Sequence, residues 1–99
     1  MRLTDDQRSI IKSAVTKIVG ADSKVWLFGS RVDDRKRGGD IDLLVETGRV
    51  ISGKVSLLCK LEGALVMSLG DRKIDVLLKD GQMNEAPIFL AAKEKGVLL

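Results

Sequence analysis

Three short apolar runs, the first two separated by a polar loop and the last two by a stretch of helical periodicity, constrain what this chain can fold into more than any other feature. They occupy residues 25–28, 40–46 and 73–78, and the second and third carry aspartates among aliphatic residues. Apolar runs of this length, bounded by turn-forming residues, are typical of buried β-strands. Because successive side chains of a strand point to opposite faces, Asp40 and Asp42 are expected to share one face of the second strand.

Asp75 repeats this pattern in the third apolar run. It is expected to point to the same face as Leu77, while the aliphatic residues between and around them point to the other face. An aspartate flanked by aliphatic residues must be solvated, paired with a cation or bound to a metal ion. These three carboxylates are therefore the first candidates for a functional site.

The first helical stretch carries clear start and stop signals. Thr4 and Gln7 have the spacing of a capping box, and Gly20 is a natural end for the helix. Apolar residues recur between them at helical spacing. They are Ile10, Ile11, Ala14, Val15, Ile18 and Val19.

Two further helices are predicted. Ser52 can cap the second, which is expected to run to about Leu69. Asn84 can cap the third, with Pro87 in its first turn, where the missing N–H matters little, and Gly96 at its end.

The predicted order is helix, strand, loop, strand, helix, strand, helix, with an apolar tail at residues 97–99. This order predicts an α/β (α+β) fold in which helices pack on a small mixed β-sheet. It leaves the order and direction of the strands open. The length of 99 residues predicts a single domain over residues 1–99.

Composition narrows the chemistry that this chain can perform. It contains no histidine, which excludes the commonest general base and the Ser-His-Asp triad. It also contains no tyrosine. The net charge of +3 suits an anionic ligand or an acidic partner, but it falls short of a dedicated nucleic-acid binder. Nucleic acid is therefore not the expected partner.

Cysteine usage and hydropathy indicate the compartment. Cys59 is the only cysteine, so no internal disulfide can form, and a reducing compartment is expected. Its position on a helical stripe predicts a small core residue. No apolar run is long enough to cross a membrane, and the N-terminal residues lack the apolar core of a signal peptide. We therefore expect a cytoplasmic protein with no membrane segment.

The turn after the first predicted strand has the features of a phosphate site. Gly29 lets the backbone approach a phosphate without a Cβ in the way. Ser30 offers a hydroxyl and a backbone N–H, and Arg31 begins a basic loop that can neutralise triphosphate charge. Taken alone, a Gly-Ser turn after a strand is more often only a turn, and a basic loop is more often only solvated surface.

The aspartates have the chemistry of a magnesium site. Mg²⁺ prefers oxygen ligands and relies on one or two carboxylates together with substrate phosphates. Asp40 and Asp42 are the expected ligands. Asp75 can hold a second ion, or accept a proton from the acceptor, if its strand lies beside theirs. The alternative for Asp40 is a cap or the end of a turn after Gly39, and the alternative for Asp42 and Asp75 is an exposed sheet face.

Three segments together resemble the DNA polymerase beta-like nucleotidyltransferase superfamily, and more narrowly the minimal nucleotidyltransferases of prokaryotes. They are LFGSR at 27–31, GDIDLLV at 39–45 and KIDVL at 73–77. The resemblance covers nearly the whole chain, including the first helix and KGVLL at 95–99. The loop before the second segment is one residue shorter than in the common minimal form, so its basic residues receive no individual roles.

The resemblance implies a polymerase beta-like fold and a Mg²⁺-dependent transfer of AMP from ATP. In proteins of this type the acceptor is a tyrosine of a small helical HEPN toxin encoded alongside, and the nucleotidyltransferase is the antitoxin. Two Mg²⁺ ions are expected from the chemistry of phosphoryl transfer, and the expected assembly is an oligomer or a hetero-oligomer. The implied metal and catalytic residues are Asp40, Asp42 and Asp75, and the implied nucleotide-binding residues are Gly29 and Ser30. Arg31 joins these two as a nucleotide-binding candidate because of its charge and not through the resemblance.

Two other functions are compatible with the same residues. The chain can be a non-catalytic antitoxin that neutralises a HEPN partner by covering it. It can also be a small-molecule nucleotidyltransferase of the aminoglycoside-modifying kind, although it would then need a partner chain to supply the acceptor site.

Overall fold

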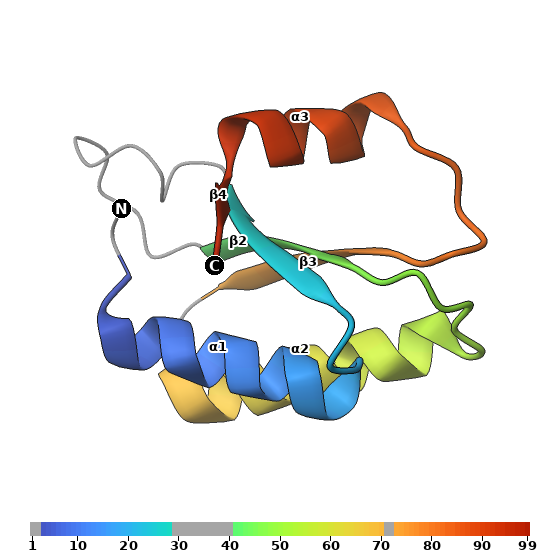
Figure 1. The fold of residues 1–99 in the computed structure, drawn as a ribbon. Coiled ribbons are helices and arrows are strands. Elements are labelled where there is room, and N and C mark those ends of the chain that lie inside the picture. Colours follow the sequence, from blue (N-terminus) through green and yellow to red (C-terminus); the bar gives the residue numbers. More distant parts are fainter. Residues whose placement is uncertain (1–2, 29–40, 71–72) are drawn as a thin grey trace.

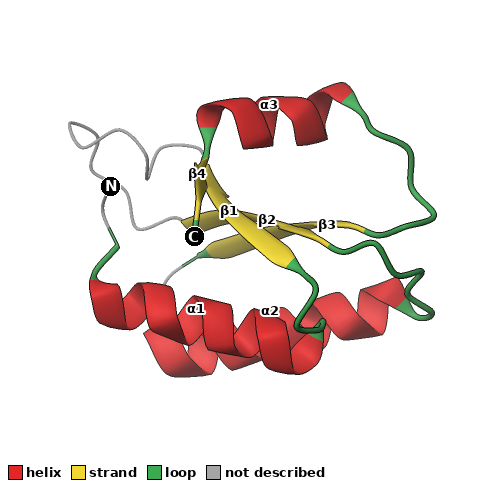
Figure 2. Ribbon diagram, in the orientation of Figure 1, coloured by secondary structure: helices red, strands yellow, loops and turns green. Residues whose placement is uncertain are grey.

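The computed structural model describes residues 3–28, 41–70 and 73–99, and within them the chain forms one four-stranded sheet between two layers of helix. Helices α1 and α2 pack on one face of the sheet and α3 lies on the other (Figures 1 and 2). The elements are α1 (Asp5–Ile18), β1 (Lys24–Phe28), β2 (Ile41–Glu46), α2 (Lys54–Leu69), β3 (Ile74–Lys79), α3 (Pro87–Lys95) and β4 (Val97–Leu98).

The sheet has the order β3-β2-β1-β4 and is mixed, which confirms the predicted fold class. Strand β1 pairs antiparallel with β2 and with β4, whereas β2 and β3 are parallel. Parallel neighbours cannot be joined by a tight turn, so a crossover must connect them. Helix α2 is that crossover, and it returns the chain so that β3 lies beside β2.

The main core lies between the sheet and the helices α1 and α2. Ile11 of α1, Leu61 and Leu65 of α2, and Leu27 and Leu43 of the sheet are fully buried there. Each strand contributes alternate residues to this core, because the side chains between them point to the α3 face. The alternation predicted from the sequence is therefore observed.

A smaller core lies under α3. Phe89 and Ala92 pack on Leu44 of β2. At the edge of this core, Lys93 of α3 donates to Glu46 Oε2 at 2.5 Å, and its Nζ lies 5.6 Å from the centroid of the Trp26 ring. The hydrogen bond to Glu46, against the opposing effect of burial, raises the pKa of Lys93 above its ordinary value. This lysine anchors α3 to the sheet.

The capping box of α1 is confirmed: Thr4 Oγ1 accepts from the Gln7 N–H at 3.1 Å, and Gln7 Oε1 accepts from the Thr4 N–H at 3.0 Å. The predicted cap of α2 is wrong. Gly53, not Ser52, occupies the N-cap, with φ of 69° and no capping side chain. Glycine adopts this left-handed conformation without steric cost.

The cap of α3 and the C-terminal tail also differ from the prediction. Ala86, not Asn84, is the N-cap of α3. It is extended, as a residue before proline prefers, and Pro87 then sets the first helical φ. The apolar tail forms the edge strand β4, in which Leu98 pairs with Trp26.

Cys59 is exposed on α2, so its predicted place in the core is wrong. The buried residues of α2 are Leu61 and Leu65. Two residues correspond to roughly 200° around a helix, so Cys59 points away from Leu61 and from the sheet. Among the helices of the described residues, none is both long and apolar enough to cross a membrane.

Gly96 joins α3 to β4 where two backbones meet closely, and substitution there tests that packing. A Cβ would contact the Ala92 carbonyl oxygen and would lie 2.8 Å from that of Leu27. We expect Gly96→Ala to lower the free energy of unfolding by about 1–3 kcal/mol in urea titrations. The control is Gly63→Ala on the exposed side of α2, where a Cβ meets no atom within 4 Å.

Because alanine is the better helix former, Gly63→Ala should raise the free energy of unfolding by about 0.5–1 kcal/mol. Equal effects of the two substitutions would contradict the close packing at Gly96.

Candidate functional site

Two of the predicted carboxylates, Asp42 and Asp75, are direct neighbours in the sheet. Asp42 of β2 is in register with Asp75 of β3 in the parallel ladder. It is also in register with Phe28 of β1 in the antiparallel ladder. Residues in register on neighbouring strands point to the same face. The two carboxylates therefore share the α3 face, as Leu44, two residues after Asp42, also does.

The pair lies at one end of the sheet, where β1 ends and β2 and β3 begin. Phe28 is the last residue of β1, and Ile41 is the first of β2. The Ile41 N–H donates to the Lys73 carbonyl at 2.9 Å, which fixes the starts of β2 and β3 side by side. Gly29 follows Phe28 directly in the sequence, so the predicted phosphate turn begins from the strand end beside Asp42.

The other predicted site residues lie outside the described residues. They are Gly29, Ser30, Arg31 and Asp40. Their roles stay predictions, as does the expectation that Asp40 shares the face of Asp42.

Exposure differs between the two carboxylates. Asp75 is exposed on β3, which is an edge strand of the described sheet, and Asp42 is half-buried on the inner strand β2. Helix α3 packs against β1 and β2. The sheet face over Asp75 is consequently more accessible than the face over β1.

Side chains on this face form three successive levels across β2 and β3. Asp42 and Asp75 form the first level, Leu44 and Leu77 the second, and Glu46 and Lys79 the third. Lys79 Nζ lies 3.7 Å from Glu46 Oε2, and Lys93 also binds Glu46.

Asp42 and Asp75 lie at a different level of the sheet from the lysines that bind Glu46. The rise of a strand puts the Cα atoms of Asp42 and Glu46 about 13 Å apart. Lys79 and Lys93 thus form ion pairs at the Glu46 level, several residues along β2 from Asp42.

The paired carboxylates fit a hard cation. Neighbouring strands are about 4.8 Å apart, so carboxylates on the same face can approach one ion, and their oxygens are the ligands that Mg²⁺ prefers. No cluster of three or more histidine, cysteine, aspartate or glutamate side chains placed to hold a metal occurs in the described part of the chain. Asp42 and Asp75 belong to that part and Asp40 does not.

Asp80, the residue directly after β3, is a buried carboxylate. Its side chain is fully buried. It accepts from the N–H of Ile51 at 2.8 Å and of Gln82 at 3.2 Å, and Lys54 Nζ lies 3.3 Å from it. These contacts tie the end of β3 to the start of α2, at the opposite end of the strands from Asp42. Asp80 is therefore a structural residue of this fold.

The hydrogen bond from Ile51 is the main cause that lowers the pKa of Asp80 below its ordinary value of 3.8. A carboxyl with a lowered folded-state pKa stabilises the fold above its unfolded-state pKa, and the stabilisation is lost as the pH falls through the folded-state pKa. We expect Asp80→Asn to lower the free energy of unfolding at pH 7. The difference from the wild type should shrink as the pH is lowered below about 4.

Denaturant titrations across this pH range measure the difference, with Glu94→Gln, at an exposed position on α3, as control. A wild-type advantage that stays constant down to the acid end would show that the Asp80 charge is not the stabilising element.

Comparison of the chain with known proteins found no relative. A scan against protein-family models found no match to the chain, and a search of curated proteins found no match either. The functional assignment therefore depends on the residues themselves.

Proposed function

We propose that this chain is a Mg²⁺-dependent nucleotidyltransferase that transfers AMP from ATP to a tyrosine of a HEPN toxin, and so acts as the antitoxin. The observation that carries the proposal is the register of β2 with β3, which puts Asp42 and Asp75 side by side on one face. They lie at the strand end from which the sequence continues into Gly29 and Ser30. This combination of residues resembles the site motif of the minimal nucleotidyltransferases.

Each residue has a proposed role that follows from its chemistry. Asp42 and Asp75 would hold the metal, together with Asp40. Bound Mg²⁺ would neutralise triphosphate charge and orient the phosphate that is attacked. Gly29 would give room for a phosphate, and Ser30 would donate hydrogen bonds to it.

Two features of the chain support an acceptor on another protein: its lack of tyrosine and the exposure of Asp75. The chain has no tyrosine, so a tyrosine acceptor must be supplied by another chain. Asp75 is exposed on the edge strand β3. A side chain carried by a folded partner can therefore approach the carboxylate pair across β3.

Incubation with α-labelled ATP, Mg²⁺ and the proposed cognate HEPN toxin tests the proposal. We expect label on the HEPN protein with the wild type. Transfer should fall by at least about 100-fold with Asp42→Asn or Asp75→Asn, because loss of even a group behind a metal ligand costs roughly 10- to 100-fold. Chelation of Mg²⁺ should abolish transfer.

Glu94→Gln is the matched control, since it removes an exposed carboxylate of α3 that has no role in the proposed site. No label transfer by the wild type, or equal transfer by Asp42→Asn, would contradict catalysis.

Binding without catalysis is the second candidate, and exposed apolar side chains favour it. Ile88 and Leu90 of α3 and Leu98 of β4 are each at least half exposed, at 55%, 52% and 50%. Such side chains are suited to an interface with another protein. If the double variant Asp40→Asn/Asp42→Asn still neutralises the toxin in cells, covering the toxin is sufficient. Loss of neutralisation, with the complex still formed, supports catalysis.

A further inference from the structure

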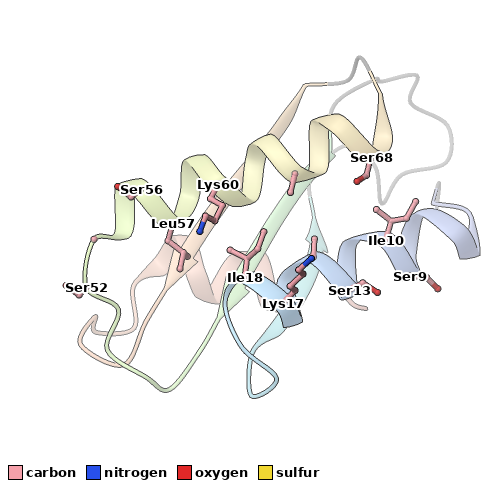
Figure 3. Close-up of a pocket in the computed structure, with 13 residues that line it drawn as sticks. Ser9, Ile10, Ser13, Lys17, Ile18, Ser52, Ser56, Leu57, Lys60 and Ser68 are labelled. Atoms are coloured by element: carbon pink, nitrogen blue, oxygen red, sulfur yellow. The ribbon is translucent and has the colours of Figure 1, made fainter.

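A long groove runs between α1 and α2 on the side of these helices that faces away from the sheet (Figure 3). Its volume is about 920 Å³, and it is lined entirely by α1, α2 and the turn that precedes α2. Ser9 of α1 and Ser68 of α2 lie at one end, and Ile18 and Ser52 lie at the other, so the two helices run antiparallel along it. The sheet separates this groove from the Asp42–Asp75 face.

The lining of the groove is apolar along its floor and polar along its walls. Ile10, Ile18 and Leu57 are partly exposed there. Ala14 and Ala64, whose side chains are small, also line the groove. Serines occupy the rims. They are Ser9, Ser13, Ser52, Ser56 and Ser68.

The charged side chains that line the groove are both basic. Lys17 of α1 and Lys60 of α2 both line it and are both exposed. Among the described residues that line it, none is acidic. A partner that covers this apolar floor must therefore bring anionic side chains to its edges, or leave two ammonium groups without counter-charges.

The shape favours a helix as the occupant. The segment of α1 from Ser9 to Ile18 corresponds to roughly 14 Å of helix axis, or between two and three turns of an α-helix. Helices pack by setting the side-chain ridge of one into a groove of another. A third helix lying between α1 and α2 would fill the apolar floor with residues spaced three and four apart.

A second copy of this chain fits the groove poorly. In a two-fold dimer through this surface, both copies would bring Lys17 and Lys60 into the same interface, with no acidic residue in the described lining to pair with them. Like charges at an interface disfavour association. The occupant with complementary charge is a helix that carries aspartate or glutamate beside its apolar stripe.

We propose that the α1–α2 groove is a docking site for an acidic amphipathic helix of another protein. This site is independent of the nucleotidyltransferase proposal, because it lies on the other side of the sheet from Asp42 and Asp75. A partner can therefore hold this surface while the carboxylate face stays open.

The test uses a display library of helix-forming peptides of about 14 residues, or about 21 Å of helix. Their apolar stripe is drawn from leucine, isoleucine, alanine and phenylalanine, and the flanking positions vary among glutamate, glutamine and lysine. The library is sorted against the whole chain, and a selected peptide is then titrated by fluorescence anisotropy. We expect glutamate to be enriched at the flanking positions.

Two variants locate the binding. Lys17→Glu/Lys60→Glu should weaken the selected peptide by about tenfold or more. Lys12→Glu/Lys95→Glu changes the net charge equally at exposed positions outside the groove and should leave the affinity within about twofold. Ser13→Trp, which fills the groove from its rim, should also abolish binding. Circular dichroism melts of all three variants confirm that they are folded.

Three results would overturn the proposal. The first is a sort that yields no binder or that enriches lysine. The second is a selected peptide whose affinity is unchanged by Lys17→Glu/Lys60→Glu in folded protein. The third is a wild-type dimer in light scattering that Ser13→Trp dissociates, which would make a second copy of this chain the occupant.

Discussion

The pairing of β2 with a strand on each side is the constraint on which the rest of this structure depends. Residues Ile41, Leu43, Leu44 and Val45 of β2 are all fully buried, because helices cover both of its faces. The antiparallel ladder aligns the end of β1 with Asp42, and the parallel ladder aligns Asp75 with Asp42. A slip of one residue would turn every side chain of β3 to the other face. The burial of Ile74 and Leu78 among the α2-side core residues resists that slip.

On the α3 face of the sheet, two sets of charged side chains lie at opposite ends of the strands. At one end, Glu46 binds Lys79 and Lys93 and so fastens α3 to the sheet. At the other end, Asp42 and Asp75 are placed beside each other. The apolar level of Leu44 and Leu77 lies between the two ends. The same strand thus serves stability at its end and the proposed chemistry at its start.

Much of the fold was predictable because its signals are local. The capping box of Thr4 and Gln7, the two-residue alternation of the strands and the proline at the start of α3 each depend on residues close together in the sequence. The errors came from long-range contacts and from backbone conformation. Residues 97–98 form a strand only because β1 offers an unpaired edge. Gly53 replaces Ser52 as the N-cap because the chain enters α2 through a left-handed turn.

The sequence by itself determined the types of side chain available for chemistry: carboxylates in strands, a Gly-Ser turn, and neither histidine nor tyrosine. It also determined, through the period of two, which face each aspartate takes within its own strand. Only the tertiary structure decided that Asp42 and Asp75 are neighbours and that α1 and α2 leave a basic groove between them. The physical reason is that strand pairing and helix packing join residues far apart in the chain, and the burial of apolar surface over the whole fold selects among the alternatives.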